Sequence, residues 1–316
     1  MRVLVTGADG FVGPWLISRL LEAGHQVGGA HHVRAGPPAR LPPSERERVA
    51  WRPLELGSRE SVAQAVAGEW DAVVHLAALA SGVEARADPG LAWEVNAAGT
   101  ARLAEALLGG ASDGASAPLL LLVSTAEIYG TGIGAARRES DPVAPCSPYA
   151  ASKYGAEVAA LEVRRRTGLR VIIARPFGHT GPGQDTRFAI PAIASRVRLA
   201  KRVGAPAINV GNLDAVRDIV DVRDVVAAYV LLLEGGVPGE SYNIASGEGH
   251  ALREVLERIQ RMVGWRVVAE YDPGLARRAD ILHLVGDAGK LHAATGWAPQ
   301  IPLDQTLQDL LDAQTD

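Results

Sequence analysis

Tyr149 and Lys153 are the residues of this chain whose types and spacing best suit proton transfer. They stand four residues apart, and Pro148 directly precedes Tyr149. A proline favours the first turn of a helix because its φ is fixed and it lacks an N–H, and residues at i and i+4 of a helix share one face. An ammonium beside a phenol favours the phenolate and lowers the pKa of the phenol. Such a pair could act as an acid or a base on a carbonyl or alcohol oxygen.

Thr125 could complete this arrangement. It follows an apolar run at 117–123 that predicts a buried strand, and its hydroxyl could hydrogen-bond the same oxygen. A Tyr-x-x-x-Lys pattern also occurs by chance on amphipathic helices. Whether this pattern indicates a catalytic pair therefore depends on the helices and strands around it.

Up to residue 175, short Val/Leu/Ile-rich runs alternate with helix-length segments. The runs lie at 3–5, 26–30, 49–54, 72–76, 119–123 and 171–174. Strands that are apolar on both sides and separated by helices predict a parallel sheet covered on both faces. We therefore expect an α/β fold with a Rossmann-type doubly wound parallel sheet, whose ligands lie at the carboxyl ends of the strands.

A glycine-rich turn follows the first of these runs. Gly7, Gly10 and Gly13 would let the backbone approach a pyrophosphate at the N-terminus of the next helix, where free N–H groups and the helix dipole favour an anion. The spacing is Gly-x-x-Gly-x-x-Gly, and it comes directly after a predicted strand. This context predicts a dinucleotide-binding turn.

The end of the second strand bears on the choice of cofactor. A NAD enzyme places an acid there for the ribose hydroxyls, whereas this chain has His31, His32 and Arg34. The missing acid and the nearby arginine favour the 2′-phosphate of NADP, with NAD as the alternative. No metal site is predicted, because neighbouring residues on a strand point to opposite sides and no ligand stands at a suitable spacing.

The second half of the chain has shorter elements. The Pro- and Gly-rich segment 175–184 predicts a loop without regular structure, and Asp221 is expected to cap a helix. The predicted division is an NADP-binding Rossmann domain at 1–175, to which a segment at about 210–235 returns, and a mainly substrate-binding, smaller C-terminal lobe at 176–316.

Composition excludes several classes of partner. The chain has 316 residues, 47% of them hydrophobic, and a formal net charge of −4, so it has no basic excess for nucleic acid or an anionic membrane. The single Cys146 excludes an internal disulfide framework and favours a cytoplasmic setting. The longest apolar run is far shorter than the ~20 residues of a membrane-spanning helix, and the first residues indicate neither signal peptide nor anchor.

Together, several motifs resemble the extended short-chain dehydrogenase/reductases that act on nucleotide sugars. The motifs are the glycine turn at 7–13, His75-Leu76-Ala77-Ala78, Asn96, Thr125-x-Glu127-x-Tyr129-Gly130 and Tyr149-x-x-x-Lys153. Within that family the stretches at 175–184, 211–218, 221–224 and 295–299 look most like those of GDP-4-dehydro-6-deoxy-D-mannose reductases. The resemblance covers nearly the whole chain.

This resemblance implies roles for individual residues. Tyr149 would protonate the sugar C4 oxygen, Lys153 would hold the nicotinamide ribose, and Thr125 would orient the carbonyl. The cofactor-binding set is Gly7, Gly10, Phe11, Val12, Gly13, Arg34, Glu55, Leu56, Leu76, Ala77, Ala78, Tyr149, Lys153, Pro176 and Phe177. The substrate-binding set is Ser81, Thr125, Glu127, His179, Arg217, Arg277 and Asp280, with Arg217 on the diphosphate.

Three positions depart from the family pattern. Gly178 stands where the family usually has Asn, Arg278 replaces a proline, and Asp280 is shorter than the usual Glu. All three belong to the substrate side. The identity of the sugar and the base is therefore the part of the prediction that these departures affect.

The resemblance favours an NADPH-dependent reductase that converts the 4-keto group of a nucleotide-linked 6-deoxyhexulose, most like GDP-4-dehydro-6-deoxy-D-mannose, to GDP-6-deoxy-D-mannose (GDP-D-rhamnose). A GDP-mannose 4,6-dehydratase is the nearest alternative, because Glu127 stands where that lyase has its base. A nucleotide-sugar 4-epimerase and a non-catalytic NADP-binding scaffold are the others. Helices expected around 91–108 and 149–163 resemble the dimer interface of the family, which predicts a homodimer.

Overall fold

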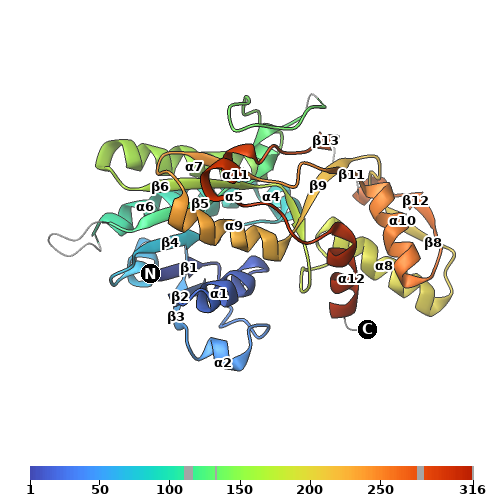
Figure 1. Ribbon diagram of the computed structural model, residues 1–316, viewed down its shortest axis with the longest axis horizontal. Helices are drawn as coiled ribbons and strands as arrows, with labels where there is room; N and C mark the ends of the chain where they lie inside the picture. The colour runs from blue at the N-terminus through green and yellow to red at the C-terminus, as the bar shows by residue number, and fades with distance from the viewer. Residues whose placement is uncertain (110–116, 132–133, 276–280, 315–316) are drawn as a thin grey trace.

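A seven-stranded parallel sheet forms the centre of the computed structural model (Figure 1). Its order is β10-β6-β5-β4-β1-β2-β3, and each neighbouring pair is parallel. The strands are β1 (Arg2–Thr6), β2 (Gln26–His32), β3 (Ala50–Leu54), β4 (Ala72–His75), β5 (Leu119–Val123), β6 (Val171–Pro176) and β10 (Ser241–Ile244). The expected Rossmann-type fold is confirmed. Only β10 was missing from the predicted strands of this sheet.

The structure describes residues 1–109, 117–131, 134–275 and 281–314. Arg277, Arg278 and Asp280, which the sequence placed on the substrate side, lie outside these ranges.

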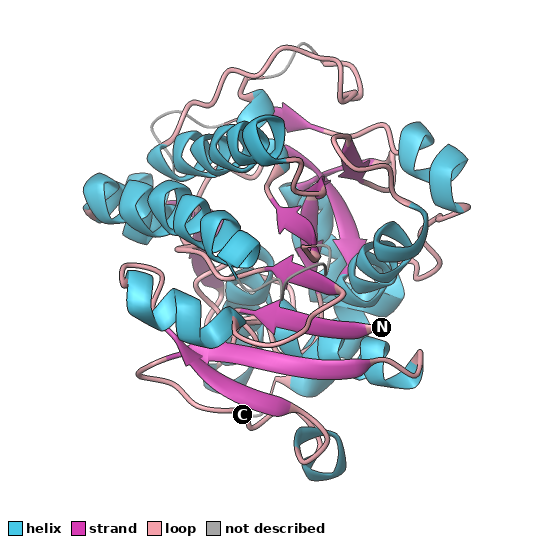
Figure 2. Cartoon of the chain, turned by 90° about the vertical axis from the view of Figure 1, so that its left-hand side faces the viewer, coloured by secondary structure: helices cyan, strands magenta, loops and turns pink. Residues whose placement is uncertain are grey.

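Helices cover both faces of the sheet (Figure 2). Successive side chains of β1 point to opposite faces, so Val3 and Val5 join one core cluster and Leu4 joins the other. The first cluster lies under α1 (Val12–Glu22) and α9 (Val222–Gly235). The second lies under α3 (Arg59–Val66), α6 (Gly99–Gly109) and α7 (Pro148–Thr167). The order of the strands reverses direction between β1 and β4, and ligands of such folds bind at this point.

Short elements connect the larger ones. They are α2 (Pro43–Arg46), α4 (Gly82–Ala87), α5 (Pro89–Trp93), η1 (Glu94–Ala98) and η2 (Ala126–Tyr129). The η2 turn follows β5 directly and carries Glu127 between Thr125 and Tyr129. It therefore holds the predicted Thr125-x-Glu127 motif at the carboxyl end of the sheet.

A second group of elements packs around its own core, to the right of the sheet in Figure 1. Its helices are α8 (Ala189–Val203), α10 (Leu252–Val263) and α12 (Leu303–Ala313), with the turn η3 (Pro273–Leu275), whereas α11 (Gly289–Thr295) packs beside β10 and α9 of the large sheet. Its strands are β7 (Gly178–Thr180), β8 (Ala207–Val210), β9 (Val216–Asp221), β11 (Gly249–Ala251), β12 (Val268–Tyr271) and β13 (His283–Leu284). Elements α9, α11 and β10 come late in the chain but contact the large sheet. The division of the chain into two domains at residue 175 stays a prediction.

The prediction of an irregular segment at 175–184 is wrong in its first half. Strand β6 continues through Pro176, and β7 pairs in parallel with β9. The Phe177 N–H donates to the Ile244 carbonyl at 2.9 Å. The partners of this segment lie 40 or more residues downstream, so its local Pro and Gly content gave no sign of the pairing.

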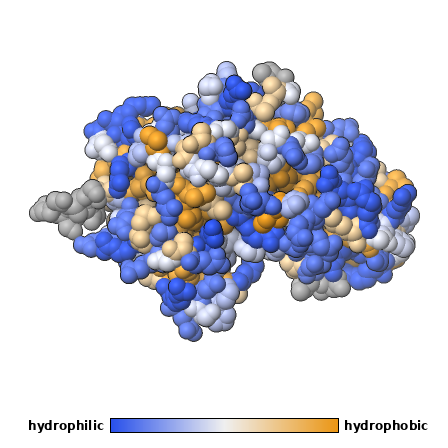
Figure 3. Space-filling view, in the orientation of Figure 1, coloured by the Kyte–Doolittle hydropathy of each residue, from blue (hydrophilic) through white to orange (hydrophobic). Residues whose placement is uncertain are grey.

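Hydrophilic residues cover most of the face seen in Figure 3, with separate hydrophobic patches between them. Within the described part of the chain, no helix is both long enough and apolar enough to cross a membrane.

Candidate active site

Helix α7 presents Tyr149 and Lys153 on one face. As predicted, Pro148 occupies its first turn, and the Ser147 side chain caps it by accepting from the Ala150 N–H at 3.1 Å. Lys153 is 4% exposed, and its Nζ donates to the Val123 carbonyl at 2.6 Å. This hydrogen bond ties the helix to the end of β5, two residues before Thr125.

Burial is the main influence on Lys153. It lowers the pKa of the Lys153 ammonium to about 8, while the negative charge of Glu157, one helical turn later, raises that pKa. An ammonium buried beside a phenol is available to stabilise a phenolate when it is protonated and loses this effect when it is neutral. The site is therefore expected to depend on pH in the mildly alkaline range.

Thr125 and Glu127 adjoin this pair at the carboxyl end of β5. Thr125 is 8% exposed and its hydroxyl accepts from the Glu127 N–H at 3.2 Å. The hydroxyl proton of Thr125 remains available to a substrate oxygen. Thr125, Lys153 and the first turn of α7 thus converge as the sequence predicted, while their roles stay predictions.

The turn between β1 and α1 suits a pyrophosphate. Phe11, at the start of α1, makes no side-chain capping bond, and the first turn of the helix has no acidic residue. Free N–H groups at such an end attract an anion. Gly7 has a φ of +68°, and a Cβ there would lie 2.7 Å from the Ala77 nitrogen. Gly7 and the predicted Leu76–Ala78 segment therefore meet, and the residues present fit a dinucleotide.

Hydrogen bonds of His75 connect the strand before this turn to its neighbours. Its Nδ1 lies 2.7 Å from the Thr6 hydroxyl and its Nε2 lies 3.2 Å from the Thr100 hydroxyl. Thr6 also accepts from the Ala77 N–H at 3.3 Å. Burial, with a smaller effect of Lys153, lowers the pKa of His75 to about 3. A neutral imidazole thus links β1, β4 and α6.

Acid is expected to destabilise the fold through His75. Its pKa is about 3 in the folded state and about 6.5 when unfolded, so the unfolded state binds more protons between these values. No penalty exists above pH 6.5, and about 2 kcal/mol is lost by pH 5. Urea unfolding at pH 7 and 5 measures this loss. His75→Gln should remove about 2 kcal/mol of the pH dependence, whereas His292→Gln, at an exposed position, should leave it unchanged. Equal pH dependence in both variants would contradict the assignment.

The residues predicted to bind the adenosine end of the cofactor differ in exposure. Arg34 is exposed just beyond β2, and its N–H donates to the His32 Nδ1 at 3.3 Å. The Nε2 of His32 lies 3.3 Å from the Glu55 carboxylate at the end of β3. Leu56 is 5% exposed and packs in the core against Gly99. Arg34 and Glu55 therefore lie at the same edge of the sheet, whereas the Leu56 side chain contributes packing.

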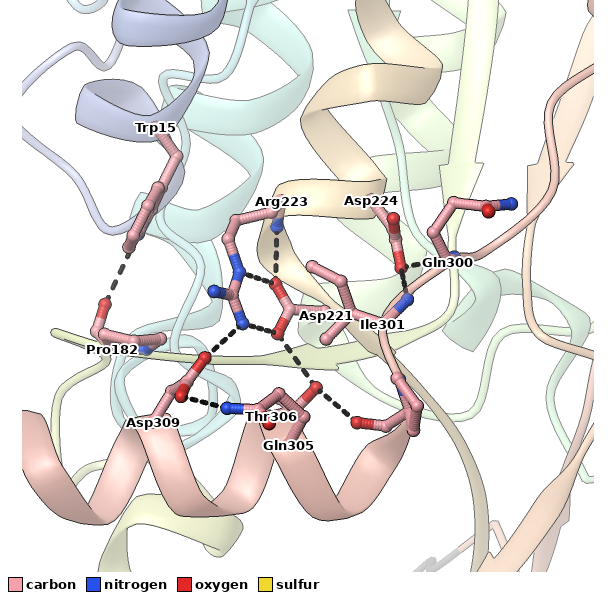
Figure 4. Close-up of polar contacts among 11 residues, drawn as sticks. Trp15, Pro182, Asp221, Arg223, Asp224, Gln300, Ile301, Gln305, Thr306 and Asp309 are labelled. Atoms are coloured by element: carbon pink, nitrogen blue, oxygen red, sulfur yellow. Dashed lines mark hydrogen bonds and ion pairs between the residues drawn. The ribbon is translucent and has the colours of Figure 1, made fainter.

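Two aromatic side chains join the glycine turn and α1 to β7 and to the loop that follows it. The rings of Phe11 and His179 are stacked with centroids 6.3 Å apart. Trp15, which the sequence analysis missed, donates from Nε1 to the Pro182 carbonyl at 3.3 Å (Figure 4). His179 was predicted on the substrate side, and burial lowers its pKa. The structure places it against a predicted cofactor-binding residue.

The remaining predicted residues are spread around these elements. Ser81 is 6% exposed, and its hydroxyl caps α4 by accepting from the Glu84 N–H at 3.3 Å. Arg217 is half-buried on β9, and its Nη1 donates to its neighbour's carbonyl, that of Val216, at 2.9 Å. Pro176 ends β6, and Phe177 packs against Tyr129 with ring centroids 6.3 Å apart. Among the residues with a described position, no His, Cys, Asp and Glu side chains form a group suited to a metal ion.

Gly178 is constrained by its neighbour in β9. A Cβ at this position would lie 2.6 Å from the Asp218 carbonyl oxygen, which is a backbone atom. The asparagine that is usual in the family could not enter without displacing β7 or β9. The backbone thus accounts for glycine at this departure from the pattern.

Comparison with known proteins agrees with this geometry. A family model described as GDP-mannose 4,6 dehydratase matches residues 4–310. The chain belongs to this family. The resemblance to extended short-chain dehydrogenase/reductases is thereby confirmed.

One curated sequence and two solved structures show what the chain is similar to. The GDP-6-deoxy-D-mannose reductase of Pseudomonas aeruginosa is 34% identical over 313 residues, which cover 98% of this chain and 96% of the relative. The structure of RMD from Pseudomonas aeruginosa in complex with NADPH is 32% identical with a TM-score of 0.81, covering 99% and 98% of the two chains. The UDP-glucose 4-epimerase of Thermus thermophilus in complex with NAD is 31% identical with a TM-score of 0.84, covering 99% and 98%.

Proposed function

We propose that this chain is an NADPH-dependent reductase of GDP-4-dehydro-6-deoxy-D-mannose that yields GDP-6-deoxy-D-mannose (GDP-D-rhamnose). The chain is an enzyme whose structural neighbours include NADPH- and NAD-bound proteins, so NAD is the alternative cofactor. The observation that carries the proposal is the buried Lys153 four residues after Tyr149, tied to Val123 at the end of β5, two residues before Thr125. The 34% identity to a reductase over nearly the full length of both chains favours this reaction within the family.

The proposed mechanism assigns one task to each residue. When bound on the glycine turn, NADPH supplies a hydride for the sugar C4 carbon. The Thr125 hydroxyl donates a hydrogen bond to the C4 oxygen and orients the carbonyl. Tyr149 gives its phenolic proton to that oxygen, and the Lys153 ammonium stabilises the phenolate that is left. Solvent then returns one proton to Tyr149, so each turnover consumes one NADPH and one proton.

Two further residues have proposed roles in binding. Arg217 is half-buried on β9 and offers a guanidinium suited to the substrate diphosphate. Arg34 is exposed near the adenosine end, where it would meet the cofactor 2′-phosphate. We also propose a cytoplasmic setting, in which the nucleotide sugar is the partner of the enzyme.

Supplying GDP-4-dehydro-6-deoxy-D-mannose with NADPH tests the proposal. The expected result is stoichiometric oxidation of NADPH, read at its nicotinamide absorbance, with formation of the 4-hydroxy sugar. The same assay with NADH measures the cofactor preference. Absence of turnover with this substrate would overturn the proposed reaction.

A 4,6-dehydratase is the second candidate, because the family model carries that description and Glu127 adjoins Thr125. A dehydratase takes GDP-mannose and recycles its cofactor without net consumption. Loss of water from GDP-mannose with no change in NADPH would favour this candidate over the reductase.

We propose that the enzyme is a homodimer formed through α5, α6 and α7. Leu91 and Trp93 on α5 and Val158 on α7 are each about half exposed, at 47%, 47% and 50%. Burial of such side chains against a second copy is favourable. Sedimentation at micromolar concentration should give a dimer, and a monomer would contradict this assembly.

A further inference from the structure

We propose that Glu157, through its buried ion pair with Arg175, is a positioning residue for Tyr149 and Lys153. This inference rests on the proposed function only where its test measures the rate of reduction. Glu157 continues the face of α7 that carries Tyr149 and Lys153, each four residues after the last.

The ion pair is buried and has the geometry of a fork. Glu157 is 1% exposed and Arg175, on β6, is 7% exposed. The Arg175 Nε and Nη2 donate to the two carboxylate oxygens of Glu157 at 3.0 and 2.7 Å. Two parallel hydrogen bonds of this kind fix both position and orientation. The pair therefore locks α7 to the central sheet one turn beyond Lys153.

The same pair extends to the segment that carries Thr125. Arg175 Nη1 donates to the Tyr129 hydroxyl at 3.0 Å, and that hydroxyl donates to the Asn243 Oδ1 at 2.7 Å. Tyr129 ends the η2 turn that begins after Thr125, and Asn243 lies on β10. One buried network thus joins α7, β6, β10 and the Thr125 segment.

Charge is the second contribution of Glu157. Its negative charge raises the pKa of Lys153 against the larger effect of burial. His75 on β4 also interacts with Lys153, and burial lowers the pKa of His75 to about 3, which keeps it neutral. Tyr149 lies one turn before Lys153 on α7. Arg175 on β6 is neutralised by Glu157 itself. Without the carboxylate, Lys153 would lose its proton at a lower pH and Arg175 would add an unbalanced positive charge.

The first experiment reads Lys153 directly, without substrate or cofactor. The chain has three lysines, Lys153, Lys201 and Lys290, so ¹³C-lysine labelling gives few signals to assign by NMR. Glu157→Gln keeps the shape of the side chain and removes its charge. The pKa of Lys153 is expected to fall by roughly one unit or more, while Lys201 and Lys290 titrate as in the native protein.

Glu162→Gln is the matched control. Glu162 lies five residues later on α7, but it is exposed and pairs with Arg166 at the surface. This variant should leave the titration of Lys153 unchanged. An unchanged Lys153 titration in folded Glu157→Gln would overturn the electrostatic part of the proposal. Because this measurement needs no turnover, it separates failure of this inference from failure of the proposed reaction.

Kinetics test the same residue in the working enzyme. Reduction needs protonated Tyr149 and Lys153, so the alkaline limb of kcat against pH should move to lower pH in Glu157→Gln by a shift similar to that of Lys153. The KM for NADPH should change much less than kcat. A variant that only loosened the fold would change the rate without moving the limb.

Tyr129→Phe tests the positioning part, including the case in which Glu157→Gln does not fold. This variant removes only the hydroxyl that joins Arg175 to Asn243 and leaves the ion pair and its charge in place. A roughly tenfold lower kcat is expected, because a small misplacement of reacting groups slows the reaction strongly, with the Lys153 titration unchanged. Native kcat in Tyr129→Phe would overturn the positioning part.

Discussion

Replacing Tyr149 by Phe is expected to lower kcat for NADPH-dependent reduction by about 10²–10⁴-fold, the usual contribution of a positioned acid or base. Phenylalanine keeps the ring and the half-buried packing of Tyr149 but has no proton to give to the sugar oxygen. Turnover at saturating substrate measures the loss. NADPH binding, followed by fluorescence, should remain close to that of the native enzyme.

Tyr154→Phe provides the matched control, since Tyr154 lies on the same helix and is 36% exposed. It should retain native kcat. If Tyr149→Phe also retains native kcat, the proton comes from another group or the chain is a non-catalytic binding protein. If both variants lose activity equally, the effect is one of helix packing.

Replacing Asp221 by Ala is expected to destabilise the protein by about 2–4 kcal/mol. As predicted from the sequence, Asp221 caps α9, and its carboxylate accepts from the Arg223 N–H at 2.8 Å. The same carboxylate accepts from the Arg223 Nη2 at 2.7 Å and the Thr306 hydroxyl at 2.8 Å (Figure 4). Asp221 is 1% exposed, so its loss removes the cap of α9 and the buried acceptor that the Arg223 and Thr306 donors share. Urea unfolding with a fixed m-value measures the difference.

Asp304→Ala is a suitable control on α12. Asp304 pairs with Arg258 at the surface, where its side chain is 63% exposed. Such a pair contributes about 0–1 kcal/mol. A double variant of Asp221→Ala and Thr306→Val should destabilise by less than the sum of the two changes, because the side chains share one hydrogen bond. Full additivity would show that the contact does not join α9 to α12.

Local patterns were enough to predict the parts of the fold that local forces build. The glycine turn after β1, the strand at 119–123 and the proline-led helix with Tyr149 and Lys153 each depend on neighbouring residues. The fold class followed from their alternation. For these elements the hydrophobic pattern and the turn chemistry agree with the final packing.

Long-range pairings could not be predicted in the same way. Strand β10 reads Ser-Tyr-Asn-Ile, which has no strong apolar run, and it joins the sheet through β6, about 70 residues earlier. The Glu157–Arg175 pair joins a helix to a strand across 18 residues of sequence. Its one local sign was a carboxylate four residues after Lys153. The contact of His179 with Phe11 likewise appears only when the two loops meet in space.

The close approach of β7 and β9 has a consequence for the divergence of this family. At Gly178 the neighbouring strand itself, and not a replaceable side chain, occupies the space of a Cβ. A mutation to asparagine is therefore expected to be tolerated only after β7 or β9 has shifted. Exchange of glycine for asparagine at this position is expected to need a shift of backbone as well as a change of residue, so a single substitution is not expected to convert one substrate pocket into the other.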